Sequence, residues 1–253
     1  LQPHIMALYT YKTSNPAFSK DVWKGYASSS NKMTVNGIIL KSFFCLLLVA
    51  STAWFTWILY SKGYNLNTIM YTGLIGSIFF SLLTAFIHRL AALLVPLYAL
   101  SLGLFLGGIS IYAESKFKGV PMQAIGVTIT TFFVMLFLYK LKIIKVTERF
   151  KSVLIVAISI IMSIYAISWS LRIFDIKSPF TTIENTSSYL TIAFNTIASG
   201  VAAFTLLLDF DFIERKKNHV PRYMEWVATW GLLVTLVWVY VEALRIMKKI
   251  VMN

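Results

Sequence analysis

Three carboxylates lie close together near the end of an apolar stretch, in the segment LDFDFIE at residues 208–214. Asp209, Asp211 and Glu214 alternate there with large apolar side chains, so the three acids cannot all turn toward one polar face. In a helix, Asp209 and Asp211 would point about 200° apart, whereas Asp211 and Glu214 would share a face. We therefore expect one aspartate to face the protein interior and the other to face lipid headgroups or the following loop.

An aspartate that faces the interior can bind a proton or a cation. A carboxylate in a partly dry cavity holds a proton more tightly than one in water, and its ionised form binds hard cations such as calcium. Asp209 and Asp211 are the candidates for such a transient calcium site. The alternative is that the acids end the helix and pair with the basic residues that follow, Arg215, Lys216 and Lys217. Spacing alone leaves both interpretations open.

Ionisable residues also occur in two other apolar stretches. Lys41 lies near the start of the first stretch, and we expect its long side chain to reach back to the lipid headgroups. Glu242 and Arg245 lie three residues apart in the last stretch. That spacing puts both side chains on one helix face, which predicts a local ion pair.

Motifs of common enzyme sites are missing from the sequence. It has no nucleophile elbow, HExxH motif, Walker loop or dinucleotide fingerprint. Its three histidines are dispersed, and its one cysteine, Cys45, lies inside an apolar run, which argues against a zinc site or an internal disulfide. We therefore expect a protein that is not an enzyme and that has no cofactor beyond a transient calcium ion.

The composition indicates an integral membrane protein. Of the 253 residues, 58% are apolar and 13% are charged, whereas soluble domains carry about 25% charged residues. Seven stretches approach the length of about 20 residues that spans a bilayer. We predict an all-α bundle of seven transmembrane helices at residues 37–253, after a polar amino-terminal arm at residues 1–36. The expected spans are residues 37–60, 68–87, 91–113, 120–139, 152–171, 189–209 and 226–247.

Basic residues outnumber acidic residues by 23 to 10. They lie between apolar spans, where anionic lipid headgroups account for them, so the lipid bilayer is an expected partner and nucleic acid is not. Lys and Arg are more frequent in the arm and in the loops after spans two, four and six than on the other side. The positive-inside rule therefore places the amino terminus in the cytoplasm and the carboxyl terminus outside.

Two features of the third span concern packing. Gly103 and Gly107 form a GxxxG motif, which lets another helix approach closely; packing within one chain is the favoured interpretation and a dimer interface is the alternative. Three residues, 88–90, separate spans two and three, which predicts a hairpin or a kinked pair.

Several motifs together resemble the bacterial branch of the Bax inhibitor family. The most specific are LDFDFIE and the segment YMEWVATWGLLVTLVWVYVEALRIM at residues 223–247. The segments SNPAF at residues 14–18, MTVNG at 33–37 and VTERF at 146–150 are also similar to the family. The resemblance implies a seven-helix fold in a bacterial inner membrane, with the last helix at the centre of the other six.

The resemblance also implies a function, that of a pH-sensitive calcium leak. In such family members, an aspartate late in span six pairs with an aspartate in span seven, and an arginine near the end of span two takes part. Asp209 matches the span-six position best and Asp211 comes second, while Arg89 matches the arginine. The span-seven position is Thr235, which is not acidic.

The threonine is a departure from the family pattern that affects the expected gating. Two neighbouring carboxylates share a proton, whereas an aspartate opposite Thr235 gains a hydrogen bond. Either Asp209 and Asp211 with Glu214 supply the coupling from span six alone, or this protein does not gate as those family members do. A second departure is Leu102 before Gly103, where the family usually has a glutamate.

A second hypothesis belongs to a different functional class. Some bacterial relatives are associated with an FtsH-type membrane protease, as modulators or as slowly degraded substrates. The basic arm at residues 6–32 would then be the segment that the protease engages. A membrane scaffold without transport activity is the third alternative, and the sequence leaves the oligomeric state open.

Overall fold

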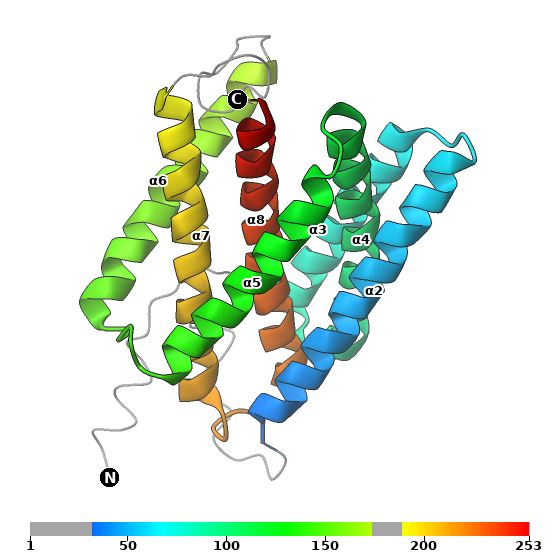
Figure 1. Ribbon diagram of the computed structural model, residues 1–253. Coiled ribbons are helices and arrows are strands. Elements are labelled where there is room, and N and C mark those ends of the chain that lie inside the picture. The colour runs from blue at the N-terminus through cyan, green and yellow to red at the C-terminus, as the bar shows by residue number, and fades with distance from the viewer. Residues whose placement is uncertain (1–31, 174–188, 253) are drawn as a thin grey trace, which may run out of the picture. The chain divides into compact units, whose positions relative to one another are not determined.

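The computed structural model describes residues 32–173 and 189–252, so most of the arm predicted at residues 1–36 lies outside the described residues. Within them, seven α-helices are long and apolar enough to cross a membrane, which confirms the predicted fold class. The helices are α2 (Val35–Ser61), α3 (Leu66–Phe86), α4 (Ala91–Lys116), α5 (Val120–Lys140), α6 (Glu148–Ile173), α7 (Tyr189–Lys216) and α8 (Met224–Met252), with a short 3-10 helix, η3 (His88–Leu90), before α4 (Figure 1).

Most helix ends lie close to the predicted boundaries, but α6 begins four residues early and two helices continue well beyond theirs. Helix α7 runs to Lys216 rather than ending at Asp209, and α8 runs to Met252 rather than to residue 247. Hydropathy shows where a helix leaves the apolar layer of the membrane. The backbone can stay helical beyond that point, because long charged side chains there reach headgroups or water. Asp211 is therefore a residue of α7 and not of the following loop.

The described residues form two compact units. The α2–α4 unit contains residues 32–121 and 211–234, which are α2, α3, α4 and the adjoining ends of α7 and α8. The α5–α6 unit contains residues 122–173, 189–210 and 235–252, which are α5, α6 and the remaining parts of α7 and α8. Of the seven helices, α8 has the largest buried share and α7 the next.

Close packing of α4 on α2 organises the α2–α4 unit. A side chain added at Gly103 would overlap Thr52 of α2, and one added at Gly107 would lie 2.9 Å from the backbone oxygen of Ala53. Both glycines of the GxxxG motif thus face α2 of the same chain, which confirms the favoured interpretation of this motif as packing within one chain.

The second and third spans form the predicted hairpin. The backbone N–H of Ile87 donates to the oxygen of Leu83 where α3 ends, and η3 leads directly into α4. Gly73 of α3 lies so close to α4 that an added Cβ would be 2.8 Å from the backbone oxygen of Ser101. Glycines on both helices therefore bring α4 close to each of its two neighbours in this unit (Figure 1).

The core of the α5–α6 unit fixes the turn of α7 that carries the first aspartate. Leu154 and Ile158 of α6 pack with Leu208 of α7, and partly buried residues surround this cluster. Phe210, two residues farther along α7, makes an edge-to-face contact with Phe132 of α5, with ring centroids 5.7 Å apart. Residues on both sides of position 209 are thus held by α5 and α6.

Replacing Gly103 by alanine is expected to lower the free energy of unfolding by about 1–3 kcal/mol, because the methyl group must displace Thr52 or separate α2 from α4. The control is Gly200→Ala, since nothing lies within 4 Å of a Cβ at that position. That change should be neutral or stabilising by up to about 1 kcal/mol. Unfolding in mixed micelles, followed by circular dichroism, measures both. Equal effects of the two substitutions would contradict the close approach at Gly103.

Candidate ion-gating site

A buried hydrogen bond joins α7 to α8 inside the α5–α6 unit. Asp209 of α7 is 1% exposed, and its Oδ2 accepts a hydrogen bond of 2.5 Å from Oγ1 of Thr235 in α8. Thr235 is itself buried, and Leu208 beside the aspartate belongs to the apolar core of this unit. The structure therefore brings together the two positions that the resemblance matched with the acid pair of the family.

The hydroxyl of Thr235 suits either protonation state of Asp209. It donates to the ionised carboxylate, and after rotation it can accept a hydrogen bond from the protonated acid. A charge in the membrane interior costs several kcal/mol unless it is compensated. Binding of a proton or a cation at Asp209 therefore changes the electrostatic energy of the interior, which is what a gating residue requires.

Asp211 and Glu214 match the alternative interpretation, because each pairs with a basic residue that follows it: Asp211 with Arg215 of α7 and Glu214 with Lys217 just beyond the end of α7. Oδ2 of Asp211 lies 2.9 Å from Nε of Arg215, and Oε1 of Glu214 contacts Nζ of Lys217. Local ion pairs thus account for the second and third acids of the cluster. The interior contact with another helix is made by Asp209.

Calcium requires more oxygen ligands than these aspartates supply together. The ion takes six to eight oxygens, and residues two apart on a helix point about 200° away from each other, so Asp209 and Asp211 cannot hold one ion jointly. No group of three or more His, Cys, Asp or Glu that could hold a metal occurs among residues 32–173 and 189–252. Of the predicted pair, Asp209 is the more deeply buried, with 1% of its surface exposed against 8% for Asp211.

Arg89 lies in η3, and its side chain is exposed. Within the described part of the chain it forms no ion pair with a carboxylate. In the same unit, Asp211 pairs with Arg215. The role of Arg89 as a counter-charge stays a prediction.

The most enclosed ion pair of the α2–α4 unit was not predicted. Glu225, in the first turn of α8, is 0% exposed, and its carboxylate contacts Nζ of Lys41 in α2. The expectation that Lys41 reaches back to the headgroups is therefore wrong. A buried carboxylate lies within its reach and compensates its charge, and the ammonium also lies 5.3 Å from the ring centre of Trp226.

Residues at the start of α2 complete this site. The backbone N–H and the hydroxyl of Thr34 each donate to Oε1 of Glu225 at 2.9 Å, and Thr34 caps α2 by accepting from the N–H of Gly37 at 3.1 Å. A side chain at Gly37 would overlap the carboxylate of Glu225. Two segments that carry the resemblance, MTVNG and YMEW, thus meet in space, and their joint presence is a signal that could have pointed to Glu225.

A second buried carboxylate lies in the α5–α6 unit. Oε1 of Glu242 is 3.1 Å from Nη1 of Arg245, which confirms the predicted local ion pair. The same oxygen accepts hydrogen bonds from the hydroxyl of Tyr165 in α6 at 2.7 Å and from Nε1 of Trp238 at 3.1 Å. Spacing within one helix could not predict the partner on α6.

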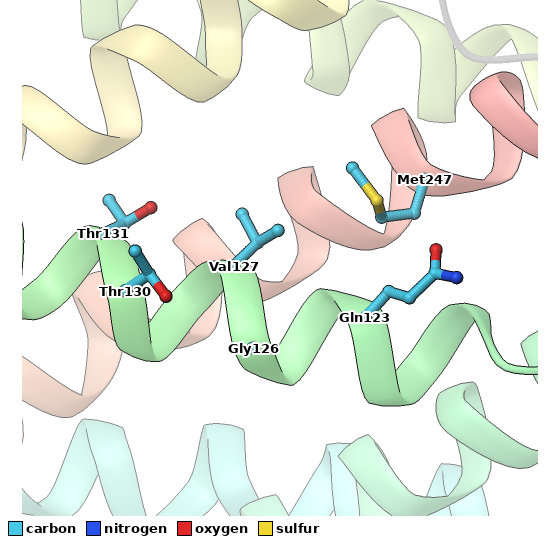
Figure 2. A pocket seen from close by; sticks show the side chains of 6 residues that line it. All are labelled: Gln123, Gly126, Val127, Thr130, Thr131 and Met247. Atoms are coloured by element: carbon cyan, nitrogen blue, oxygen red, sulfur yellow. The ribbon is translucent and has the colours of Figure 1, made fainter.

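An open groove of about 490 Å³ lies between α5 and α8 in the α5–α6 unit. Figure 2 shows the side chains of Gln123 and Met247 directed toward the space between the two helices. Neither Asp209 nor Glu242 lines this groove, so it is separate from both buried carboxylates. Its lining residues are Gln123, Gly126, Val127, Thr130, Thr131 and Met247.

Seven apolar helices with carboxylates buried in the last two define a polytopic integral membrane protein. Comparison with models of protein families assigns this membrane protein to a family. The model described as Bax inhibitor 1 like matches residues 15–252, nearly the whole chain, and the protein belongs to this family. A comparison with curated proteins finds no match. The match confirms the resemblance to the Bax inhibitor family, while the assignment to its bacterial branch stays a prediction.

Removing the cation of the buried pair is expected to destabilise the α2–α4 unit. Lys41→Met leaves the carboxylate of Glu225 without its ammonium, which should cost about 3–5 kcal/mol of unfolding free energy. The double variant with Glu225→Gln should recover much of this loss, because no uncompensated charge remains. Thermal or denaturant unfolding in micelles measures the free energy of unfolding of the parent, of each single variant and of the double variant.

Lys62→Met is the matched control, because Lys62 is exposed at the end of α2 and its removal should change stability by less than about 0.5 kcal/mol. If Lys41→Met behaves like Lys62→Met, the headgroup interpretation of Lys41 is restored.

Proposed function

We propose that this protein is a cation leak of the membrane, with calcium as the most suitable ion, and that protonation of Asp209 controls the leak. The observation that supports it is the buried hydrogen bond between Asp209 and Thr235, which places an ionisable oxygen in the apolar interior of the α5–α6 unit. Membership of the Bax inhibitor 1 like family favours the same activity.

The ionised carboxylate attracts a hard cation, and protonation removes that attraction. A path lined by two coupled acids would respond to two protons. Because Thr235 stands at the second position, we expect the control to depend on one proton, with Asp209 as the group that binds it. The ion pairs of Asp211 with Arg215 and of Glu214 with Lys217 support this choice of residue.

The test is calcium flux into proteoliposomes at pH 6 and pH 8. The parent should show a flux that differs between the two pH values, and Asp209→Asn should make the flux equal at both, because an amide does not bind the proton. Asp211→Asn and Glu214→Gln are controls of similar chemistry and should keep the parental dependence. Thr235→Asp should give a steeper dependence on pH, since it restores an acid pair.

Flux indistinguishable from that of empty liposomes, with folded protein, would end the leak proposal. A non-transporting role would then come first, either as a scaffold or as a modulator or substrate of an FtsH-type membrane protease. A flux that Asp211→Asn alters and Asp209→Asn does not would transfer the gating role to the second aspartate.

We also propose that the protein lies in a bacterial inner membrane, with its amino terminus in the cytoplasm. The excess of basic residues in the loop between α5 and α6 supports this orientation. With Cys45 replaced by alanine, a single cysteine at Lys145 should be labelled by a membrane-impermeant thiol reagent after permeabilisation of the cells. One at Lys118, between α4 and α5, should be labelled in intact cells. The reverse pattern would invert the topology.

A further inference from the structure

The two carboxylate oxygens of Glu242 differ in their hydrogen bonds. The side chain is 0% exposed, and its Oε1 accepts from Tyr165, Trp238 and Arg245. Its Oε2 is buried and has no hydrogen-bond partner among the described residues. A carboxylate oxygen inside a membrane segment normally finds a donor, because leaving it bare costs free energy. The free oxygen therefore indicates a ligand.

The ligand position lies on a polar face of α8. Thr235, Trp238, Glu242, Arg245 and Lys249 follow one another at spacings of three and four residues, which places them on one side of the helix. Thr235 already contacts Asp209, and Glu242 lies about two turns farther along. The same face of α8 thus carries two acid sites within the α5–α6 unit.

Charges around Glu242 limit what Oε2 can bind. Nη1 of Arg245 is 3.1 Å from Oε1, and its guanidinium lies 4.4 Å from the ring centre of Tyr165. Lys249 lies about two turns beyond Glu242 on the same face of α8, while Phe194, the ring neighbour of Tyr165 from α7, carries no charge. A metal cation would meet repulsion from these bases and a single open oxygen, fewer ligands than calcium or magnesium takes. A proton requires one lone pair.

We propose that Oε2 of Glu242 is a proton-binding site, separate from Asp209, and that Arg245 is its counter-charge. A proton from water forms an O–H bond at Oε2, and the carboxylate becomes a neutral acid. No other covalent bond changes. Tyr165, Trp238 and Arg245 can still donate to Oε1, but the guanidinium of Arg245 loses its ionic partner. The positive charge at this end of α8 then rises by one.

This site does not require that the protein conducts calcium. Failure of the leak proposal leaves the proton site standing. Failure of the proton site leaves the role of Asp209 unchanged.

Infrared difference spectra between acidic and neutral buffer test the site directly, because a protonated carboxyl group has its own C=O stretching band. The protein is reconstituted in lipid, and Glu242→Gln is compared with Asp209→Asn. Glu214→Gln serves as the control for an exposed carboxylate. We expect Glu242→Gln to remove one carboxyl band that both other variants retain. A spectrum of Glu242→Gln identical to that of the parent would overturn the proposal.

Trp238 offers a second measurement that leaves Glu242 in place. Its indole N–H donates to Oε1, so neutralising the acid weakens a charge-assisted bond and shifts the emission of this tryptophan. The pH-dependent part of the emission should disappear in Trp238→Phe and also in Glu242→Gln. Emission that follows pH equally in Glu242→Gln and in the parent would contradict protonation at this residue, even if one variant folded poorly.

Discussion

Hydrocarbon does not solvate an ionised side chain, so each charge placed within the spans must be compensated by another group of the protein. Glu225 has the ammonium of Lys41 and two donors from Thr34, and Glu242 has the guanidinium of Arg245. Each contact requires a fixed position of the helices that supply it. The charged residues of a largely apolar chain therefore determine how its helices meet within each unit.

Asp209 differs from these two glutamates because its contact on α8 is a neutral hydroxyl. A hydroxyl stabilises an ionised carboxylate less than a cation does, and it tolerates the protonated acid equally well. Two kinds of buried acid are thus present. The carboxylate of Glu225 is compensated by the ammonium of Lys41, whereas Asp209 makes a hydrogen bond with Thr235 that can persist when the aspartate is protonated. Both oxygens of Glu225 are also engaged, one by Thr34 and one by Lys41, whereas Oε2 of Glu242 has no hydrogen-bond partner among the described residues. These contacts are the physical basis for proposing sensitivity to protons at Asp209 and Glu242 and not at Glu225.

The seven helices could be predicted from sequence because hydropathy measures directly what the membrane requires of each span. The opposite directions of Asp209 and Asp211 followed from helix geometry alone. The pair formed by Lys41 and Glu225 could not be predicted in this way, because its members lie 184 residues apart and periodicity describes one helix at a time. Tyr165 as a partner of Glu242 was missed for the same reason.

The pairing of α2 with the start of α8 also has a consequence for biosynthesis. Among the seven described helices, Lys41 belongs to the one that is synthesised first and Glu225 to the one that is synthesised last. While the intervening helices are being made, the lysine lies in the membrane region without the carboxylate that compensates it. The charge of Lys41 is therefore compensated only once the chain has been made as far as α8.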